Sequence, residues 1–252
     1  MKAGIRYLHY LPLIVTLGLG FLMALHGPIA QPSHYHHFAD ARAAWGLPNA
    51  ADVLSNLGFA AAGLWGWICC SNAHNNDDAG VRSPGYRLFL LALLLTAAGS
   101  FYYHLQPDDA RLVWDRIPIA LACAGLLAAV HGETTGSTHV MRNAAVLAIA
   151  AVWSVVWWNV SGDLRPYLLM QALPLILIPL WQWIHGAARS ERLAFGVAIL
   201  LYVLAKLTEL HDHEILAMSG SISGHTLKHL LATVAAFVIV SVLVKRTKPV
   251  SQ

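Results

Sequence analysis

Charged residues are scarce in this sequence. Asp, Glu, Lys and Arg make up 12% of its 252 residues, about half of the roughly 25% that is usual in soluble domains. Hydrophobic residues make up 57%, and the mean hydropathy is +0.56. This composition excludes an ordinary soluble domain and predicts a polytopic membrane protein, because membrane spans are long, apolar and nearly free of charge.

Cysteines are few and basic residues are dispersed. The three cysteines, Cys69, Cys70 and Cys123, all lie within apolar runs, and an odd number in such positions gives no disulfide framework. The net charge of +3 comes from residues in loops and at the termini rather than from one basic patch. We therefore expect no nucleic-acid partner, and no obligate protein partner is evident from the sequence.

Eight apolar stretches, joined by short polar loops, predict an all-α helical bundle. We expect a seven-helix membrane domain over residues 31–252, preceded by one additional transmembrane helix within residues 1–30. Lys2 and Arg6 before the first stretch also fit a signal peptide, so both interpretations of residues 1–30 stay open. The stretches cover residues 11–26, 52–70, 87–104, 115–131, 143–160, 166–185, 193–210 and 225–244.

Lys and Arg residues are distributed unequally across the predicted membrane domain. Ten lie on the side of both termini and four on the other side, while Lys206 and Lys228 lie within spans near that second side. Because basic loops tend to stay in the cytoplasm, we expect cytoplasmic termini, and the short loops suggest a bacterial inner membrane. The ten are Lys2, Arg6, Arg82, Arg87, Arg142, Arg189, Arg192, Lys245, Arg246 and Lys248, and the four are Arg42, Arg111, Arg116 and Arg165.

Five polar residues lie at one membrane surface in this topology. Ser100 and His104 end the third helix one turn apart, and Asp115 opens the fourth helix. His225 and His229 share one face of the eighth helix. Polar and ionisable side chains within a membrane are costly and are usually functional. The five residues therefore predict a common site near the non-cytoplasmic surface.

Three imidazoles with one open position are typical of a catalytic zinc site, in which the metal polarises a carbonyl and lowers the pKa of its water to about 7. On this hypothesis His104, His225 and His229 bind Zn²⁺. Asp115 takes a proton from water and later delivers it to a leaving amine. Ser100 donates a hydrogen bond to the oxyanion that develops on the attacked carbonyl.

Each of these residues also has a simpler interpretation. A His-x-x-x-His pair alone is weak support for a metal site. A lone helical serine such as Ser100 commonly bonds back to its own backbone, and Asp115 beside Arg116 can form only an interfacial ion pair. Several buried polar groups without a shared purpose would be costly in a bilayer, which favours the common site.

The same motifs, in the same order, resemble those of the alkaline ceramidase family. Ser100 and His104 form a Ser-x-x-x-His motif, Asp115 follows eleven residues after that histidine, and His225 and His229 form the C-terminal His-x-x-x-His motif. The wider superfamily of seven-helix membrane hydrolases includes the adiponectin and progestin receptors. The resemblance covers about residue 40 to the end.

Ser55 and Asn56 strengthen this resemblance, because they are similar to a Ser-Asn element at the start of the family's first core helix. The resemblance implies that the three histidines bind zinc, that Asp115 activates water and that Ser100 stabilises the oxyanion. It also implies a ceramide-like membrane lipid as substrate, cleaved to a fatty acid and a sphingoid base.

The segment before the second helix departs from the family pattern. Animal alkaline ceramidases carry an acidic calcium-binding segment there, whereas the corresponding stretch of this sequence has only two acids, Asp40 and Asp52. With Asn49 they could supply oxygen ligands to a Ca²⁺ ion. We prefer to interpret Asp52 as a helix cap.

Two further polar clusters have no fixed role. The tract with His34, His36 and His37 can bind metal in principle, but we expect a solvated loop. Glu209 and Asp212 belong to a polar cluster that ends the seventh helix on the side of the site. This cluster lines an entrance, orients a ligand imidazole or forms a polar loop.

The leading functional hypothesis is a zinc-dependent amidohydrolase that cleaves the N-acyl amide bond of a ceramide-like lipid. The alternatives are a hydrolase of a different amide or ester lipid, a lipid-binding receptor or sensor of the same fold, and a transporter with a proton relay. Short cytoplasmic loops argue against a receptor. A cluster at one surface, rather than charges throughout the membrane depth, argues against a relay.

Overall fold

The computed structural model describes residues 7–72 and 83–247. Within these ranges the chain is helical and contains no β-strand, and seven helical segments are long and apolar enough to cross a membrane. The predicted all-α architecture of a multi-pass membrane protein is therefore confirmed. Four residues of the charge count, Lys2, Arg6, Arg82 and Lys248, lie outside the described residues.

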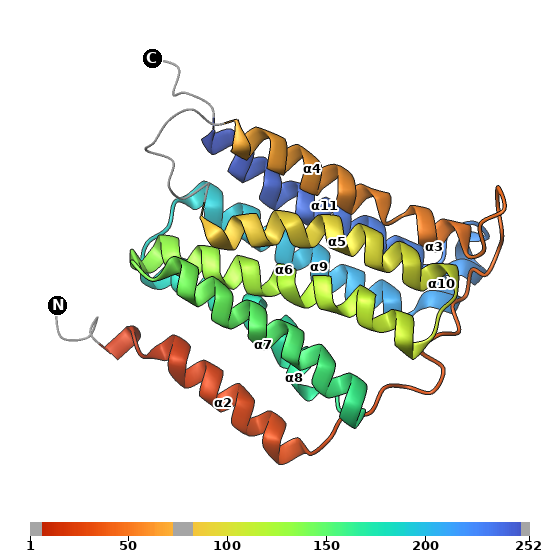
Figure 1. Cartoon of the computed structure of the whole chain (residues 1–252), viewed down its shortest axis with the longest axis horizontal. Coiled ribbons are helices and arrows are strands. Elements are labelled where there is room, and N and C mark those ends of the chain that lie inside the picture. Colours follow the sequence, from red (N-terminus) through yellow and green to blue (C-terminus); the bar gives the residue numbers. More distant parts are fainter. Residues whose placement is uncertain (1–6, 73–82, 248–252) are drawn as a thin grey trace.

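The first described helix, α2 (Leu11–His26), is the additional N-terminal helix that the first apolar stretch predicts. It lies at the edge of the bundle against α8 (Arg165–Ile184) (Figure 1). An extended segment then runs along one end of the molecule to the short helix α3 (Ala50–Leu54). The N-terminal helix is thus an addition to the remaining helices rather than part of their interior.

Seven spans form the rest of the bundle. α3 and α4 (Leu57–Ser71) together make the first span, and a short helix α10 (Asp212–Ser219) separates the last two. Figure 1 shows α3 and α10 at the same end of the bundle, with the start of α2 and the end of α11 at the opposite end. The other spans are α5 (Pro84–Leu105), α6 (Asp109–Thr135), α7 (Val140–Ser161), α8, α9 (Arg189–Leu210) and α11 (Gly224–Arg246).

Helix α6 begins earlier than residue 115, where the apolar pattern starts. The side chain of Asp108 accepts a hydrogen bond from the backbone N–H of Arg111 and caps the helix. Asp115 therefore lies in the second turn of α6 and does not open it, which corrects the sequence prediction. The reason is that the first turn of α6, which contains the charged residues Asp109 and Arg111, continues the helix beyond the continuous apolar run from which the start was predicted.

Helices α5 and α6 pack with their backbones in close contact. A Cβ atom added at Gly99 would lie 2.0 Å from the backbone oxygen of Trp114, and one added at Gly125 would lie 2.7 Å from the backbone nitrogen of Phe89. Small residues allow such approaches between membrane helices. Because Gly99 precedes Ser100 and Trp114 precedes Asp115, this contact sets the distance between two predicted site residues.

The end of the bundle opposite α3 and α10 is held by a cluster of charged side chains. Arg246 of α11 forms ion pairs of 2.6 Å with Glu133 of α6 and with Glu191 of α9. The hydroxyl of Tyr86 donates a further hydrogen bond to Glu133. Four helices are thus tied together at that end, while the outer face of α9 is apolar and exposed at Leu193, Val197, Leu200 and Leu207, as expected for contact with lipid.

We predict that Gly99→Ala destabilises the protein by about 1–3 kcal/mol, because the added methyl group has no room and must force α5 and α6 apart. The matched control is Gly196→Ala on α9, where nothing lies within 4 Å of an added Cβ. Thermal unfolding of both purified variants in detergent checks the prediction. Equal melting temperatures for the two variants would contradict the close packing of α5 and α6.

Candidate metal centre and lipid cavity

Three histidines from two helices meet at the end of the bundle where α3 and α10 lie. His104 is in the last turn of α5, and His225 and His229 are in the first two turns of α11. All three are buried, and one ligand nitrogen from each lies within 4.8 Å of the other two. The triad is the single group of His, Cys, Asp or Glu residues in the described ranges that meets this condition. These three side chains could hold a metal ion, as the sequence predicts.

The ring nitrogens face one another in a way that suits a cation. The Nε2 atoms of His104 and His225 are 3.4 Å apart. Two neutral imidazole nitrogens that both present lone pairs repel each other, so a proton or a cation is required between them. The ring centroids of the three histidines lie 4.7 to 4.9 Å apart, which gives a nearly symmetric triangle.

His229 is oriented by the Ser-Asn element of the first span. The Ser55 hydroxyl lies 2.8 Å from Nδ1 of His229 and donates its own proton to the backbone oxygen of Asp52. Its lone pair therefore accepts the Nδ1–H of the imidazole, which leaves Nε2 free as a ligand. Asn56 also lies 3.3 Å from the same Nδ1 and donates to the oxygen of Asp52. Ser55 thus holds one imidazole in the tautomer that metal binding needs, whereas the Asn56 amide nitrogen is a donor and cannot accept the Nδ1–H.

Ser100 and Asp115 lie beside each other on the wall of the cavity that His229 also lines. Both are buried, and their side chains interact. The ion pairs of the described residues do not include one between Asp115 and Arg116. The alternative of an interfacial ion pair is therefore wrong, because adjacent residues on a helix point in different directions.

The cavity extends from these polar groups into the apolar interior of the bundle. Its volume is about 300 Å³. Its polar end contains Ser100, Asp115, Arg116, Lys228 and His229, and the remaining wall is mainly apolar. Such a division suits a ligand with a polar group and a hydrocarbon chain. The apolar wall includes Phe59, Phe89, Leu93, Ile119, Pro174, Ile178, Phe195 and Ile239.

The segment between α2 and α3 covers the histidine triad. The ring of Phe38 packs against His225 and His104, with centroid distances of 4.2 and 4.9 Å. The backbone N–H of Ala39 donates to one oxygen of Asp212, and the backbone N–H of His225 donates to the other. Asp212 therefore links the covering segment to the first turn of α11, a role that the sequence left open.

The His-rich tract is not simply a solvated loop. Nδ1 of His36 lies 2.9 Å from the Tyr103 hydroxyl, and Nε2 lies 3.1 Å from the carboxylate of Asp109. Nε2 of His213, on α10, lies 3.2 Å from the backbone oxygen of His37. These contacts bind the tract to α5, α6 and α10, so it contributes to closing the site.

Two lysines and a glutamate form a group, with Lys206 exposed and Glu209 and Lys228 half-buried, that the sequence analysis leaves without a role. Glu209 accepts hydrogen bonds of 2.9 Å from both Lys206 and Lys228. The ammonium group of Lys228 also lies 3.0 Å from Nε2 of His225. The signal in the sequence was the position of both lysines within apolar spans, where an ionisable group demands a partner.

The candidate calcium ligands are each engaged elsewhere. Asp40 binds the Arg42 guanidinium at 2.7 Å, and this hydrogen bond holds the pKa of the carboxyl below its ordinary value. Asn49 donates to the backbone oxygen of His104, and Asp52 accepts a 2.6 Å hydrogen bond from Thr226. These separate partners do not support a calcium site. The interpretation of Asp52 as a cap is wrong, because it lies inside α3 and binds α11 instead.

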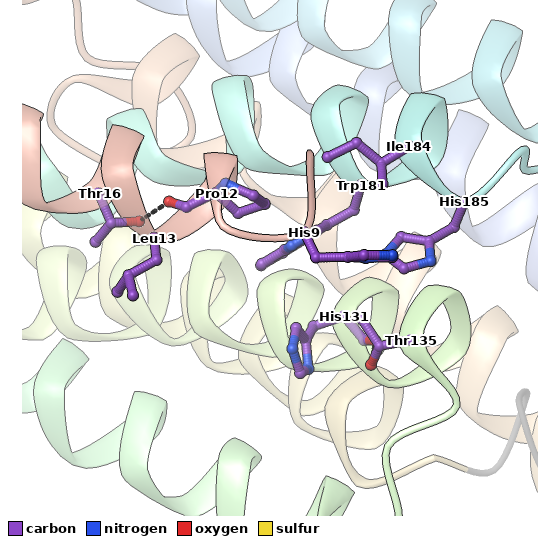
Figure 2. Close-up of a pocket in the computed structure, with 9 residues that line it drawn as sticks. All are labelled: His9, Pro12, Leu13, Thr16, His131, Thr135, Trp181, Ile184 and His185. Carbon is purple, nitrogen blue, oxygen red and sulfur yellow. Dashed lines mark hydrogen bonds between the residues drawn. The ribbon is translucent and has the colours of Figure 1, made fainter. Parts of the chain in front are cut away.

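A second cavity of about 470 Å³ lies between α2, α6 and α8, and Figure 2 shows three of its histidines. The rings of His9 and His185 are 5.4 Å apart, whereas His131 packs against Trp181. Burial, with the neighbouring His9, lowers the pKa of His185. Because these imidazoles do not converge as the triad does, they provide internal controls for metal binding.

Comparison with known proteins assigns no family and no function to the chain. No family model matches the chain, and no curated protein or solved structure is detectably similar to it. The function is therefore inferred from the residues of the site.

We predict that the purified protein binds about one transition-metal ion per chain, measured by elemental analysis after dialysis. His104→Ala, His225→Ala and His229→Ala should each remove most of this metal, because two remaining imidazoles cannot hold it tightly. His185→Ala is the matched control and should retain it. Equal metal content in all four variants would contradict the triad as the binding site.

Proposed function

We propose that the protein is a zinc-dependent hydrolase that cleaves the amide bond of an N-acyl membrane lipid of the ceramide type. One observation carries the proposal: a buried triad of histidines reaches an apolar cavity through His229, which lines the polar end of that cavity together with Asp115 and Ser100. A structural metal site would normally have four protein ligands, whereas three leave a position open for substrate.

Zinc is the metal that this donor set favours. Neutral imidazoles suit Zn²⁺, whereas Ca²⁺ and Mg²⁺ take oxygen ligands. When bound, zinc supplies Lewis-acid polarisation of a carbonyl and activation of a water molecule. The hydrogen bond between Ser55 and His229 supports the required tautomer without further rearrangement.

Asp115 and Ser100 have complementary roles in the proposed reaction. The Asp115 carboxylate takes a proton from the attacking water and delivers it to the amine nitrogen as the amide bond breaks. The Ser100 hydroxyl donates a hydrogen bond to the oxygen on which negative charge develops. Both side chains are buried and line the same cavity as His229, which supports their action on one substrate group.

The cavity and the covering segment favour a lipid rather than a soluble amide. The acyl chain would lie along the apolar wall, which includes Phe59, Phe89 and Ile178. Phe38 covers His104 and His225 on the opposite side and limits access of bulk water. We therefore infer that the substrate enters from the bilayer between helices, and that fatty acid and a sphingoid-type amine are released.

The orientation of the proposed enzyme follows from its basic residues. In the topology that the sequence predicts, ten Lys and Arg residues belong to the end of the bundle opposite the triad and four to the triad end, with Lys206 and Lys228 within spans near the triad end. By the positive-inside rule, the termini would be cytoplasmic and the site would open near the non-cytoplasmic face. We propose a bacterial inner membrane as the location.

We predict that the zinc-loaded protein in detergent releases fatty acid from N-acylsphingosine. Ser100→Ala should lower kcat about 10²–10³-fold through loss of one oxyanion donor, and Asp115→Asn should lower it at least about 10²-fold through loss of the proton carrier. Gly196→Ala and His185→Ala should retain full activity. The measurement is fatty acid release by mass spectrometry.

Turnover that survives Asp115→Asn would contradict the assigned proton transfer. Bound zinc without turnover of N-acylsphingosine would contradict the ceramide-type substrate and direct the search to another amide or ester lipid, or to a lipid-binding receptor of the same fold. Absence of metal together with absence of turnover would contradict the hydrolase.

A further inference from the structure

Arg116 is a buried charge that forms no ion pair in the part of the chain that the structure describes. Its side chain lies on the wall of the lipid cavity, and the residue is only 3% exposed. Its Nε and Nη1 atoms are buried without a hydrogen-bond partner. A guanidinium remains charged at any physiological pH, so burial without an acceptor carries a large desolvation cost.

Aromatic rings hold the guanidinium but do not satisfy its donors. Its Cζ atom lies 3.9 Å from the ring centroid of Trp158, and 5.2 and 5.1 Å from those of Tyr35 and Tyr167. Cation–π contact stabilises the charge through the faces of the rings. The N–H groups, however, lie in the plane of the guanidinium and point along it, where an oxygen acceptor is needed. The rings therefore fix the orientation of Arg116 and leave its Nε and Nη1 donors without an acceptor.

Among the described residues, neither carboxylate of the cavity wall forms an ion pair with Arg116. Glu209 accepts hydrogen bonds from both Lys206 and Lys228. Asp115 interacts with Ser100 and forms no ion pair with Arg116 among the described residues. The described part of the cavity wall thus has three cations for two carboxylates, before any metal charge is counted.

We propose that Arg116 is the binding site for an anionic group of the substrate, a carboxylate or a phosphate carried on the amine side of the scissile amide. This inference rests on the proposed function and narrows its substrate class, N-acyl membrane lipids, to those that carry an anionic group on the amine side. The planar guanidinium donates two parallel hydrogen bonds to such a group, which Lys206 and Lys228, already bound to Glu209, do not. The aromatic rings around Arg116 preorganise its side chain for binding before the ligand enters.

The test measures binding separately from turnover. The probes are the N-hexadecylsulfonyl derivatives of glycine, of O-phosphoethanolamine and of ethanolamine, which have the same chain and no cleavable carbonyl. They carry a carboxylate, a phosphate and a neutral hydroxyl group. Binding to the zinc-loaded protein in neutral detergent is measured by titration calorimetry, for the unmodified protein and for the variants Arg116→Gln, Arg116→Lys and Arg111→Gln.

At least one acidic probe should bind about tenfold or more tightly than the neutral probe, since a hydrogen bond to a charged group is worth that factor or more. The stronger of the two identifies the anion as carboxylate or phosphate. Arg116→Gln should remove this preference without weakening the neutral probe, and Arg116→Lys should keep part of it. Arg111→Gln is the control, since Arg111 is at the same end of α6 and pairs with Asp108.

Equal binding of all three probes by the unmodified protein, or a preference that survives Arg116→Gln, would overturn the inference. If Arg116→Gln does not fold, the inference is tested by comparing the binding of the three probes to the unmodified protein and to Arg116→Lys. Hydrolysis of N-palmitoylglycine and of N-palmitoylethanolamine is measured in parallel. A preference for acidic probes without hydrolysis would refute the proposed function and still support the anion site at Arg116. Hydrolysis without such a preference would support the proposed function and refute the anion site.

Discussion

Three imidazole rings share one buried space where the end of α5 meets the start of α11. In a bilayer this arrangement is costly unless something lies between the ring nitrogens, because lone pairs that face each other across 3.4 Å repel. The neighbouring groups are organised around that space. Ser55 fixes the tautomer of His229, Asp212 holds the backbone of His225, and Phe38 covers the rings. Each contact comes from a different element, so the site depends on the whole end of the bundle.

The backbone packing of α5 on α6 links this site to the fold. Gly99 lets α6 approach so closely that Ser100 and Asp115 line one wall. The ion pairs of Arg246 hold the far ends of α6, α9 and α11, and the apolar cavity lies between these two ends. A buried polar site is therefore combined with an apolar cavity, and this combination suits a ligand with a polar group and a hydrocarbon chain.

The sequence predicted the helical architecture well, because apolar runs of membrane length are a strong signal. It also predicted that His104, His225 and His229 converge, since charge asymmetry placed their helix ends at one surface. Two details failed for a physical reason. The start of α6 is determined by the Asp108 cap, and Asp52 binds Thr226 on a helix more than 170 residues away. Long-range contacts of this kind, like the aromatic rings around Arg116, leave no local pattern in a sequence.

X-ray absorption spectroscopy of the zinc-loaded protein tests the central claim most directly, because it reports the atoms bound to the metal. The account predicts three nitrogen donors and one oxygen donor at about 2.0–2.1 Å, with the imidazole signal diminished in His229→Ala. Sulfur ligation, which would indicate Cys69, Cys70 or Cys123, or a shell of six oxygens would contradict it. A protein that binds no zinc would contradict it as well.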